Sequence, residues 1–343
     1  MQNDKYIRLG LSENHNLPSK KIIEEIQKES KNINLYPDTD CIDLRNAIAR
    51  CVKLNEKQIY IGNGLDEVIL SIYLGLGIIR KKVIVSEHTF MGYFHCASLL
   101  QNEIIEIPNK NHYVNIDSII KVVQNTNAPL VFICNPHNPL GTVIEKNKIY
   151  ELARICKQIG TYLVIDEAYI EYIDKEFDVT KDIDEYNTLI VLRTLSKAYG
   201  LAGLRCGYAC ADEDVIMKME VVKKALPFSV NRIAQKAVVC ALSDGERVQE
   251  IQRINLENLQ WTKEKLKELG IIFTDSQTNF ISIYYKETVR IISFLENKYH
   301  ILVKDLSSMG MKNWIRISIG SREQMKLFIE AMGECVNKYG YEQ

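Results

Sequence analysis

A serine and a lysine, Ser196 and Lys197, follow an apolar run at residues 189–192, and Arg205 comes eight positions after the lysine. The run is typical of a buried strand. A lysine amine can form a Schiff base with an aldehyde, and serine and arginine side chains can hold a phosphate. The three residues therefore predict a site for a compound that carries both groups, as pyridoxal 5'-phosphate (PLP) does.

Polar residues also end two other apolar runs. Asn135 ends one run, and Asp166 ends the next, followed by Tyr169. Ligands of open α/β sheets sit beyond the carboxyl ends of the strands, so we expect these side chains to converge with Lys197. A carboxylate such as Asp166 would keep the pyridine nitrogen of PLP protonated. Asn135 and Tyr169 could bond to the ring hydroxyl, and Lys197 could act as general acid and base.

Each of these residues has a simpler interpretation when taken alone. An aspartate after a strand is often a turn or helix-cap residue, and Asn135 before a proline is a turn signal. A single lysine is usually solvated. All of them in this order, each at a strand end, indicate one shared site.

A glycine-containing segment at residues 62–67 is a second candidate for a phosphate contact. It follows a short strand expected at residues 58–61 and begins a predicted helix with one apolar face. Glycine permits a tight turn, and a helix N-terminus presents free amides to an anion. By itself the pattern is a common tight turn, but together with Ser196 and Arg205 it predicts a phosphate cradle.

Composition argues against several other classes of function. Lys+Arg 43 balance Asp+Glu 44, which predicts no nucleic-acid or membrane partner. Residues 1–8 lack the apolar core of a signal peptide, and the longest apolar stretch, residues 68–79, is too short to span a bilayer. The nine cysteines occur without a CxxC pair, which predicts reduced thiols, no metal site and a cytoplasmic protein.

The order of apolar runs predicts an α/β fold. Runs without polar interruption suit strands that are buried on both faces of a parallel sheet, and helical spacing between them predicts β-α-β units. We expect a large domain with a mostly parallel sheet flanked by helices. The strands are expected at residues 82–86, 104–107, 130–134, 162–165 and 189–192, and helices at residues 20–28 and 146–157.

The pattern changes from about residue 248 onward and predicts a smaller α+β domain. Helices are expected at residues 247–269, 288–298 and 322–337, with short strands at 280–284 and 314–319. We therefore predict three parts. They are an arm at residues 1–30 that packs on the small domain and a partner subunit, a large PLP-binding domain at 31–235, and a small C-terminal domain at 236–343.

These segments, taken together, resemble the fold-type I PLP-dependent aminotransferases, and within them the histidinol-phosphate aminotransferase branch. The resemblance extends over nearly the whole chain and keeps the family order. Its segments are residues 9–19, the Tyr-Pro-Asp motif at 36–38, and residues 62–67, 135–141, 166–169, 194–207 and 316–320.

The resemblance implies a role for each residue at the cofactor. Lys197 would be the Schiff-base lysine, Asp166 the partner of the pyridine nitrogen, and Asn135 and Tyr169 the partners of the ring hydroxyl. Tyr93 aligns with the aromatic residue that stacks on the ring, although an ordinary core tyrosine is an equal alternative. The cofactor phosphate would be held by Gly64, the amides of Leu65 and Asp66, Ser196 and Arg205.

The resemblance also implies contacts at the substrate and between subunits. Tyr36 would reach the cofactor phosphate of a neighbouring subunit, which implies a homodimer. Arg316 would bind an anionic end of the substrate, and Asn135 and Tyr36 are expected near the substrate as well. Lys304 stands where the branch usually has an arginine. Lysine keeps the positive charge but lacks the bidentate fork.

Three functions are compatible with these motifs. The first is a transaminase that takes an amino group from a donor such as glutamate and passes it to a small, phosphorylated keto acceptor. The alternative is a PLP-dependent decarboxylase of an O-phospho amino acid, because relatives of this branch catalyse that reaction on the same site. A non-enzymatic regulator would usually carry a DNA-binding segment, of which the balanced charge gives no sign.

Overall fold

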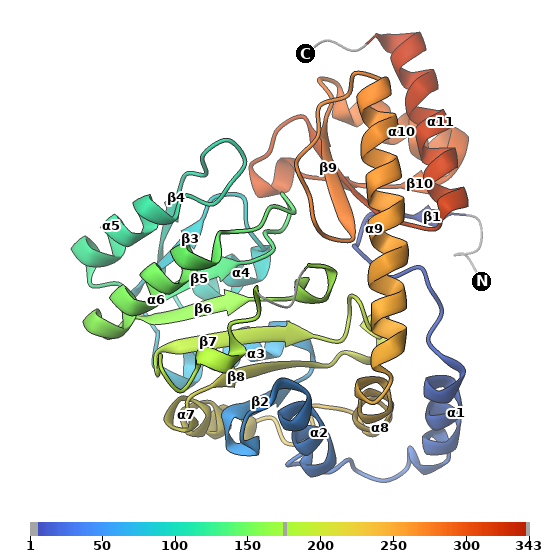
Figure 1. The fold of residues 1–343 in the computed structure, drawn as a ribbon. Helices are drawn as coiled ribbons and strands as arrows, with labels where there is room; N and C mark the ends of the chain where they lie inside the picture. The colour runs from blue at the N-terminus through green and yellow to red at the C-terminus, as the bar shows by residue number, and fades with distance from the viewer. Residues whose placement is uncertain (1–5, 174–176, 341–343) are drawn as a thin grey trace.

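The computed structural model describes residues 6–173 and 177–340 (Figure 1). Residues 1–5 of the predicted arm and 341–343 of the predicted C-terminal domain lie outside the described residues. The centre of the molecule is a seven-stranded sheet in the order β2-β8-β7-β6-β5-β3-β4. Its strands are β2 (Ile59–Gly62), β3 (Lys82–Ser86), β4 (Glu103–Ile107), β5 (Leu130–Cys134), β6 (Tyr162–Asp166), β7 (Leu189–Thr194) and β8 (Gly207–Ala211).

The large sheet is mostly parallel, as the sequence predicts. Strands β4, β3, β5, β6 and β7 run parallel to one another. Strand β8 is antiparallel to both β7 and β2. The carboxyl ends of β5, β6 and β7 therefore meet at one edge of the sheet, where Cys134 pairs in register with Asp166.

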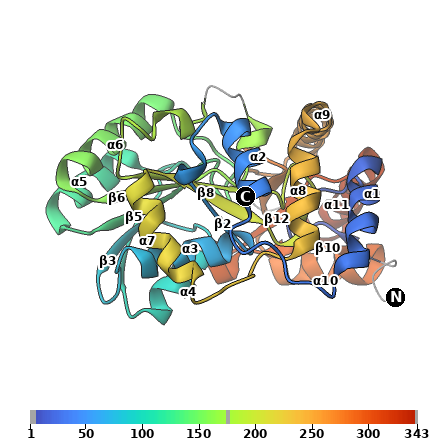
Figure 2. The ribbon, with the colours of Figure 1, turned by 90° about the horizontal axis from the view of Figure 1, so that it is seen from below.

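Alternating side chains of the inner strands bury against helices on the two faces of this sheet. Leu130 and Phe132 belong to one apolar core, and Val131 and Ile133 belong to the other. Burial on both faces explains why the strand sequences carry almost no polar residues. Figure 2 shows the two helical layers. One layer holds α3 (Gly64–Gly75), α4 (Met91–Leu99) and α7 (Glu213–Lys223), and the other α2 (Ile42–Val52), α5 (Ile116–Thr126) and α6 (Lys146–Ile159).

Helices α1 (Lys20–Glu29) and α8 (Arg232–Leu242) pack together beside the sheet. The long helix α9 (Gly245–Glu268) then runs alongside toward the C-terminal part (Figure 1). The helices predicted at residues 20–28, 146–157 and 247–269 are confirmed. None of the helices in the described ranges is both long and apolar enough to cross a membrane.

The C-terminal part has its own sheet and apolar core. Strand β12 (Trp314–Ser318) lies between β9 (Phe280–Tyr284) and β11 (Lys304–Asp305), antiparallel to both. Helices α10 (Thr288–Tyr299) and α11 (Arg322–Tyr339) pack with it. Strand β1 (Ile7–Arg8), near the N-terminus, pairs in parallel with β10 (Ile301–Leu302). The segment after β1 therefore passes from the C-terminal part back toward the large sheet.

Candidate active site

A cavity of about 340 Å³ lies where the carboxyl ends of the central strands face the small sheet. Cys134, Asp166 and Thr194, the last residues of β5, β6 and β7, line it from the large sheet. Lys304 and Arg316, on β11 and β12, line it from the small sheet. The cavity is therefore at the sheet edge that the sequence predicts for a ligand.

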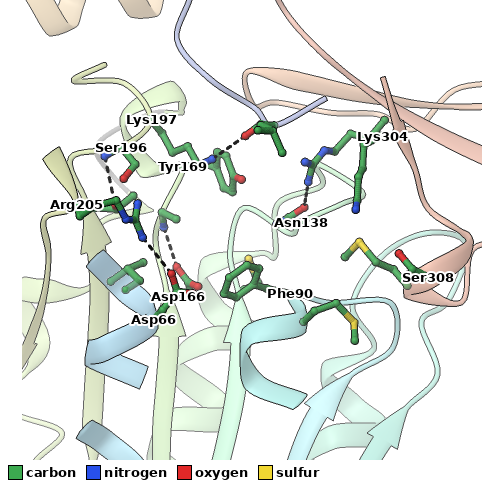
Figure 3. Close-up of a pocket in the computed structure, with 18 residues that line it drawn as sticks. Asp66, Phe90, Asn138, Asp166, Tyr169, Ser196, Lys197, Arg205, Lys304 and Ser308 are labelled. Carbon is green, nitrogen blue, oxygen red and sulfur yellow. Dashed lines mark hydrogen bonds and ion pairs between the residues drawn. The ribbon is translucent and has the colours of Figure 1, made fainter. Parts of the chain in front are cut away.

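Figure 3 shows how the polar residues divide along the cavity. Ser196, Arg205 and Asp66 gather at one end, whereas Lys304 and Ser308 lie at the opposite end. Lys197, Tyr169 and Asp166 lie between them. This order places cationic groups at both ends of the cavity, with the amine of Lys197 and the carboxylate of Asp166 between them.

The first end has the features of a phosphate cradle. Gly64 begins α3 with a φ of +78°, and a Cβ there would lie 2.4 Å from Nη2 of Arg205. The side chain of Asn63, the N-cap residue, makes no capping hydrogen bond, so it leaves the first amides of α3 to another partner. Arg205 donates to Asp66 at 3.0 Å beside these amides. A glycine turn, a helix N-terminus, Ser196 and a guanidinium together fit the phosphate of PLP.

Lys197 is held in the middle of the cavity by the N-terminal segment. Its Nζ donates to the carbonyl oxygen of Leu11 at 3.1 Å and to that of Ser12 at 3.3 Å. Burial, together with the positive charge of Arg316, lowers the pKa of Lys197 to about 8. A larger fraction of the amine is neutral at physiological pH than in an exposed lysine, and the neutral amine is the nucleophile.

Asp166 faces the cavity with its carboxylate held by two donors. The hydroxyl of Tyr93 donates to Oδ2 at 2.6 Å, and the amide of Ala168 donates to Oδ1 at 3.0 Å. Burial raises the pKa of Asp166 to about 6, while these hydrogen bonds and the charge of Lys197 act in the opposite direction. The carboxylate is therefore mostly ionised at neutral pH and can pair with a protonated ring nitrogen.

Tyr169 borders the cavity next to Lys197. Its ring centroid lies 5.5 Å from the lysine Nζ, and the ring packs edge-on against Phe280 at 5.1 Å. Burial raises the pKa of its hydroxyl above the ordinary value, so the group stays a hydrogen-bond donor.

The structure does not bring Asn135 into the cavity. Its side chain is fully buried, and its Oδ1 accepts from the amide of Ile144 at 2.9 Å. Asn138, three positions later, lines the cavity and accepts a hydrogen bond from Arg316. Residues 135–141 contain two Asn-Pro pairs, and the asparagine that lines the cavity, Asn138, belongs to the second pair.

The structure also separates Tyr93 from the cavity wall. Tyr93 is fully buried and stacks on Phe132 with centroids 4.5 Å apart. Phe90, the residue before α4, lines the cavity. Its ring contacts that of Tyr93 edge-on, with centroids 5.5 Å apart. The aromatic face that we expected from Tyr93 is therefore offered by Phe90.

Tyr36 lies away from the cavity of its own chain. Its side chain is 79% exposed and stacks on Phe228 with centroids 4.7 Å apart. Tyr36 does not line the cavity, so within one chain the structure does not bring it to the other site residues.

Two cations from the small sheet form the second end of the cavity. Lys304 and Arg316 are direct cross-strand partners in the β11–β12 pair. Arg316 is buried, and it donates to Asn138 and, at 3.1 Å, to the carbonyl oxygen of Gly10. Within residues 6–173 and 177–340, neither cation forms an ion pair with a carboxylate. This end of the cavity is therefore suited to an anion.

Sequence reasoning missed two apolar side chains of the wall, those of Leu65 and Met91. Both residues lie in the first turn of a helix, where their spacing carries no chemical pattern, so no signal in the sequence points to them. Leu11, Ser308 and Met309 also line the cavity.

Comparison with known proteins places this site in a family. Residues 4–332 match the family "Aminotransferase class I and II". "Histidinol-phosphate aminotransferase 2" of Bacillus cereus is 36% identical over 321 residues, which cover 93% of this chain and 85% of that protein. The crystal structure of histidinol-phosphate aminotransferase from Sinorhizobium meliloti in complex with pyridoxal-5'-phosphate has a TM-score of 0.89. It is 24% identical and covers 97% of this chain and 91% of that chain.

One solved structure of similar fold has a different reaction in its name. L-threonine-O-3-phosphate decarboxylase from Porphyromonas gingivalis has a TM-score of 0.83 at 20% identity, with 97% of this chain and 100% of that chain covered. That similarity concerns the fold alone. The family match and the relative at 36% identity decide the class: the chain belongs to the class I and II aminotransferases, in the histidinol-phosphate aminotransferase-like branch, and it is a PLP-dependent transaminase.

Proposed function

We propose that this transaminase acts on small substrates that end in an anionic group, with a phosphorylated keto compound as the acceptor and glutamate as the amino donor. The cross-strand pair of Lys304 and Arg316 is the observation that carries this proposal. The names of its relatives, which specify histidinol phosphate, agree with a phosphorylated substrate.

Two like charges directly opposite each other on neighbouring strands destabilise a sheet. Burial adds to this cost, and it lowers the pKa of Arg316. Lys304 lies at the opposite end of the cavity from Arg205 (Figure 3), and Arg316 is its cross-strand partner, so a cofactor phosphate at the cradle would not neutralise these two cations. An anionic substrate group between Lys304 and Arg316 would relieve both the repulsion and the desolvation.

The other polar residues suit the chemistry of a transaminase. PLP, when bound, supplies an electron sink for breaking a bond at the α-carbon of an amino acid. Ser196, Arg205 and the first amides of α3 would hold its phosphate, and Asp166 its ring nitrogen. Lys197, with its lowered pKa, would move the proton at the α-carbon. Tyr169 and Asn138 would bond to the ring hydroxyl.

A decarboxylase of an O-phospho amino acid stays the alternative with less support. It would use the same cavity, but a relative above 30% identity over most of the chain is named as an aminotransferase. We therefore do not assign the alternative.

We infer that two chains form a homodimer in which Tyr36 reaches the partner's site. Support comes from an apolar surface around Tyr36, where Ile33 and Leu35 are exposed and Phe228 stacks on the tyrosine. Exposed apolar surface of this kind marks interaction sites. The division into an arm, a large domain and a small domain, as well as the cytoplasmic location, stay predictions.

The substrate proposal predicts a preference for phosphorylated amines. Transamination of histidinol phosphate should exceed that of histidinol by at least about a hundredfold in kcat/KM, because two charge-assisted contacts are lost without the phosphate. Lys304→Met should lower kcat/KM for the phosphorylated amine by about tenfold and leave histidinol almost unaffected.

Lys298→Met, which removes an exposed lysine remote from the cavity, is the matched control and should leave both rates as in the wild type. Steady-state kinetics with the two amines measures the effect. The proposal would be contradicted by equal kcat/KM values for the two amines, or by an equal loss with both amines in Lys304→Met. Either result would show that Lys304 and Arg316 do not bind the phosphate of the substrate.

A further inference from the structure

Tyr93, a buried tyrosine behind the cavity wall, is hydrogen-bonded to Asp166, which lines the cavity. Tyr93 does not line the cavity, but its hydroxyl donates a 2.6 Å hydrogen bond to Oδ2 of Asp166. The amide of Ala168 donates to the other carboxylate oxygen. One donor on each oxygen fixes the orientation of the Asp166 carboxylate, and only the Tyr93 donor comes from a side chain.

Packing prevents the Tyr93 side chain from moving away. Its ring is stacked on Phe132 and contacts the edge of Phe90, while the hydroxyl of Tyr73 donates to the Tyr93 carbonyl oxygen at 3.1 Å. Rotation of the ring would open a void in a fully buried cluster, which close-packed cores resist. The hydroxyl therefore stays aimed at Asp166.

We propose that Tyr93 is a positioning residue: its hydroxyl keeps the Asp166 carboxylate ionised and oriented toward the ring nitrogen of the cofactor, and its ring supports Phe90 in the cavity wall. This inference rests on the proposed function, in which Asp166 is the partner of that nitrogen. Neither the family match nor the sequence motifs assign this role to Tyr93.

The physical reason is the competition between burial and hydrogen bonding at Asp166. Burial favours the neutral acid, whereas a hydrogen-bond donor favours the carboxylate. Loss of the Tyr93 hydroxyl leaves Asp166 buried with one donor fewer, so the acid binds a proton more strongly. Asp166 would then hold a protonated ring nitrogen less well, and the bound cofactor would supply a weaker electron sink.

The test uses the holoenzyme with PLP labelled with ¹⁵N in the ring, because the chemical shift of that nitrogen reports its protonation. Tyr93→Phe removes the hydroxyl and keeps the aromatic stack. The pH at which the nitrogen loses its proton should fall by about one unit. We expect kcat to fall about tenfold, a loss similar to that seen when a residue that hydrogen-bonds to a metal ligand is replaced. KM should change less than about twofold.

Tyr60→Phe is the matched control, because it removes one hydroxyl from a fully buried tyrosine of the same apolar core, and that hydroxyl bonds to Ser71 and not to Asp166 or Tyr93. Its nitrogen should titrate as in the wild type. If Tyr93→Phe fails to fold, 3-fluorotyrosine at position 93 is the second variant. Its more acidic hydroxyl should raise the titration pH instead.

Asp166→Asn tests the proposed role of Asp166 at the ring nitrogen separately from the role of Tyr93. If Asp166→Asn leaves the ring nitrogen titrating as in the wild type, the role of Asp166 itself is wrong. If Asp166→Asn changes the titration but neither change at Tyr93 moves it, Tyr93 is a packing residue and the inference is overturned.

Discussion

The chemistry of Lys197 depends on what surrounds its amine. Two backbone carbonyls hold the amine in place, while burial and the charge of Arg316 lower its pKa to about 8. An exposed lysine would be almost fully protonated at neutral pH. The cavity therefore makes Lys197 both a better nucleophile and a usable proton carrier.

The lowered pKa of Lys197 predicts a pH dependence for cofactor capture. The rate at which the cofactor-free enzyme binds PLP covalently should rise with pH and level off above about 8, because only the neutral amine attacks. Arg316→Met removes a positive charge that lowers this pKa, so its midpoint should move to higher pH. Stopped-flow absorbance of the lysine-bound cofactor gives the midpoint.

Lys298→Met provides the control and should keep the wild-type midpoint, because that exposed lysine is not among the groups that act on Lys197. The titration of free PLP is the same in the experiments with the wild type and both variants, so it does not contribute to the difference between their midpoints. An Arg316→Met midpoint equal to that of the wild type would contradict this account of the Lys197 environment.

Which residue of a motif faces the cavity is harder to predict from the sequence than the presence of the motif. The sequence correctly indicates that an asparagine and an aromatic residue belong near the site, but it does not show which member of each segment faces the cavity. The choice depends on how the chain turns after β5 and before α4. Those turns place Asn138 and Phe90 at the cavity wall, and they bury Asn135 and Tyr93 behind it.

Elements were more predictable than residues. Strands β5, β6 and β7 are confirmed at their predicted positions because strands buried on both faces leave uninterrupted apolar runs. Strand β8 was not predicted. Its residues, Gly207–Ala211, are mostly small, and its antiparallel direction follows from tertiary pairing with β7 and β2. The short strand β11 is set in the same way by its pairing with β12.

At the scale of the whole molecule, the site is assembled from distant parts of the chain. Carbonyls near the N-terminus contact Lys197, which follows β7 of the large sheet, and Arg316, which lies on β12 of the small sheet. The pairing of β1 with β10 fixes the start of this segment on the C-terminal part. Long-range pairing of this kind carries no local sequence signal, so only the resemblance to a family could predict it.

The proposed dimer predicts that two inactive variants restore activity when mixed. Lys197→Ala lacks the amine, and Tyr36→Phe lacks the hydroxyl but keeps the stack on Phe228. If Tyr36 acts across the interface, a hybrid dimer contains one intact site. Unfolding and refolding the mixture should therefore restore activity above that of either parent, and light scattering should give the mass of a dimer. A monomer, or no gain on mixing, would contradict this arrangement.

The most direct test of the central claim is a single turnover of the holoenzyme with glutamate and no acceptor. We predict one 2-oxoglutarate formed for each active site, with loss of the absorbance of lysine-bound PLP. Addition of a phosphorylated keto acceptor should restore that absorbance, and Lys197→Ala should give neither change. No 2-oxoglutarate from glutamate, together with carbon dioxide release from phosphoserine or phosphothreonine, would contradict the account.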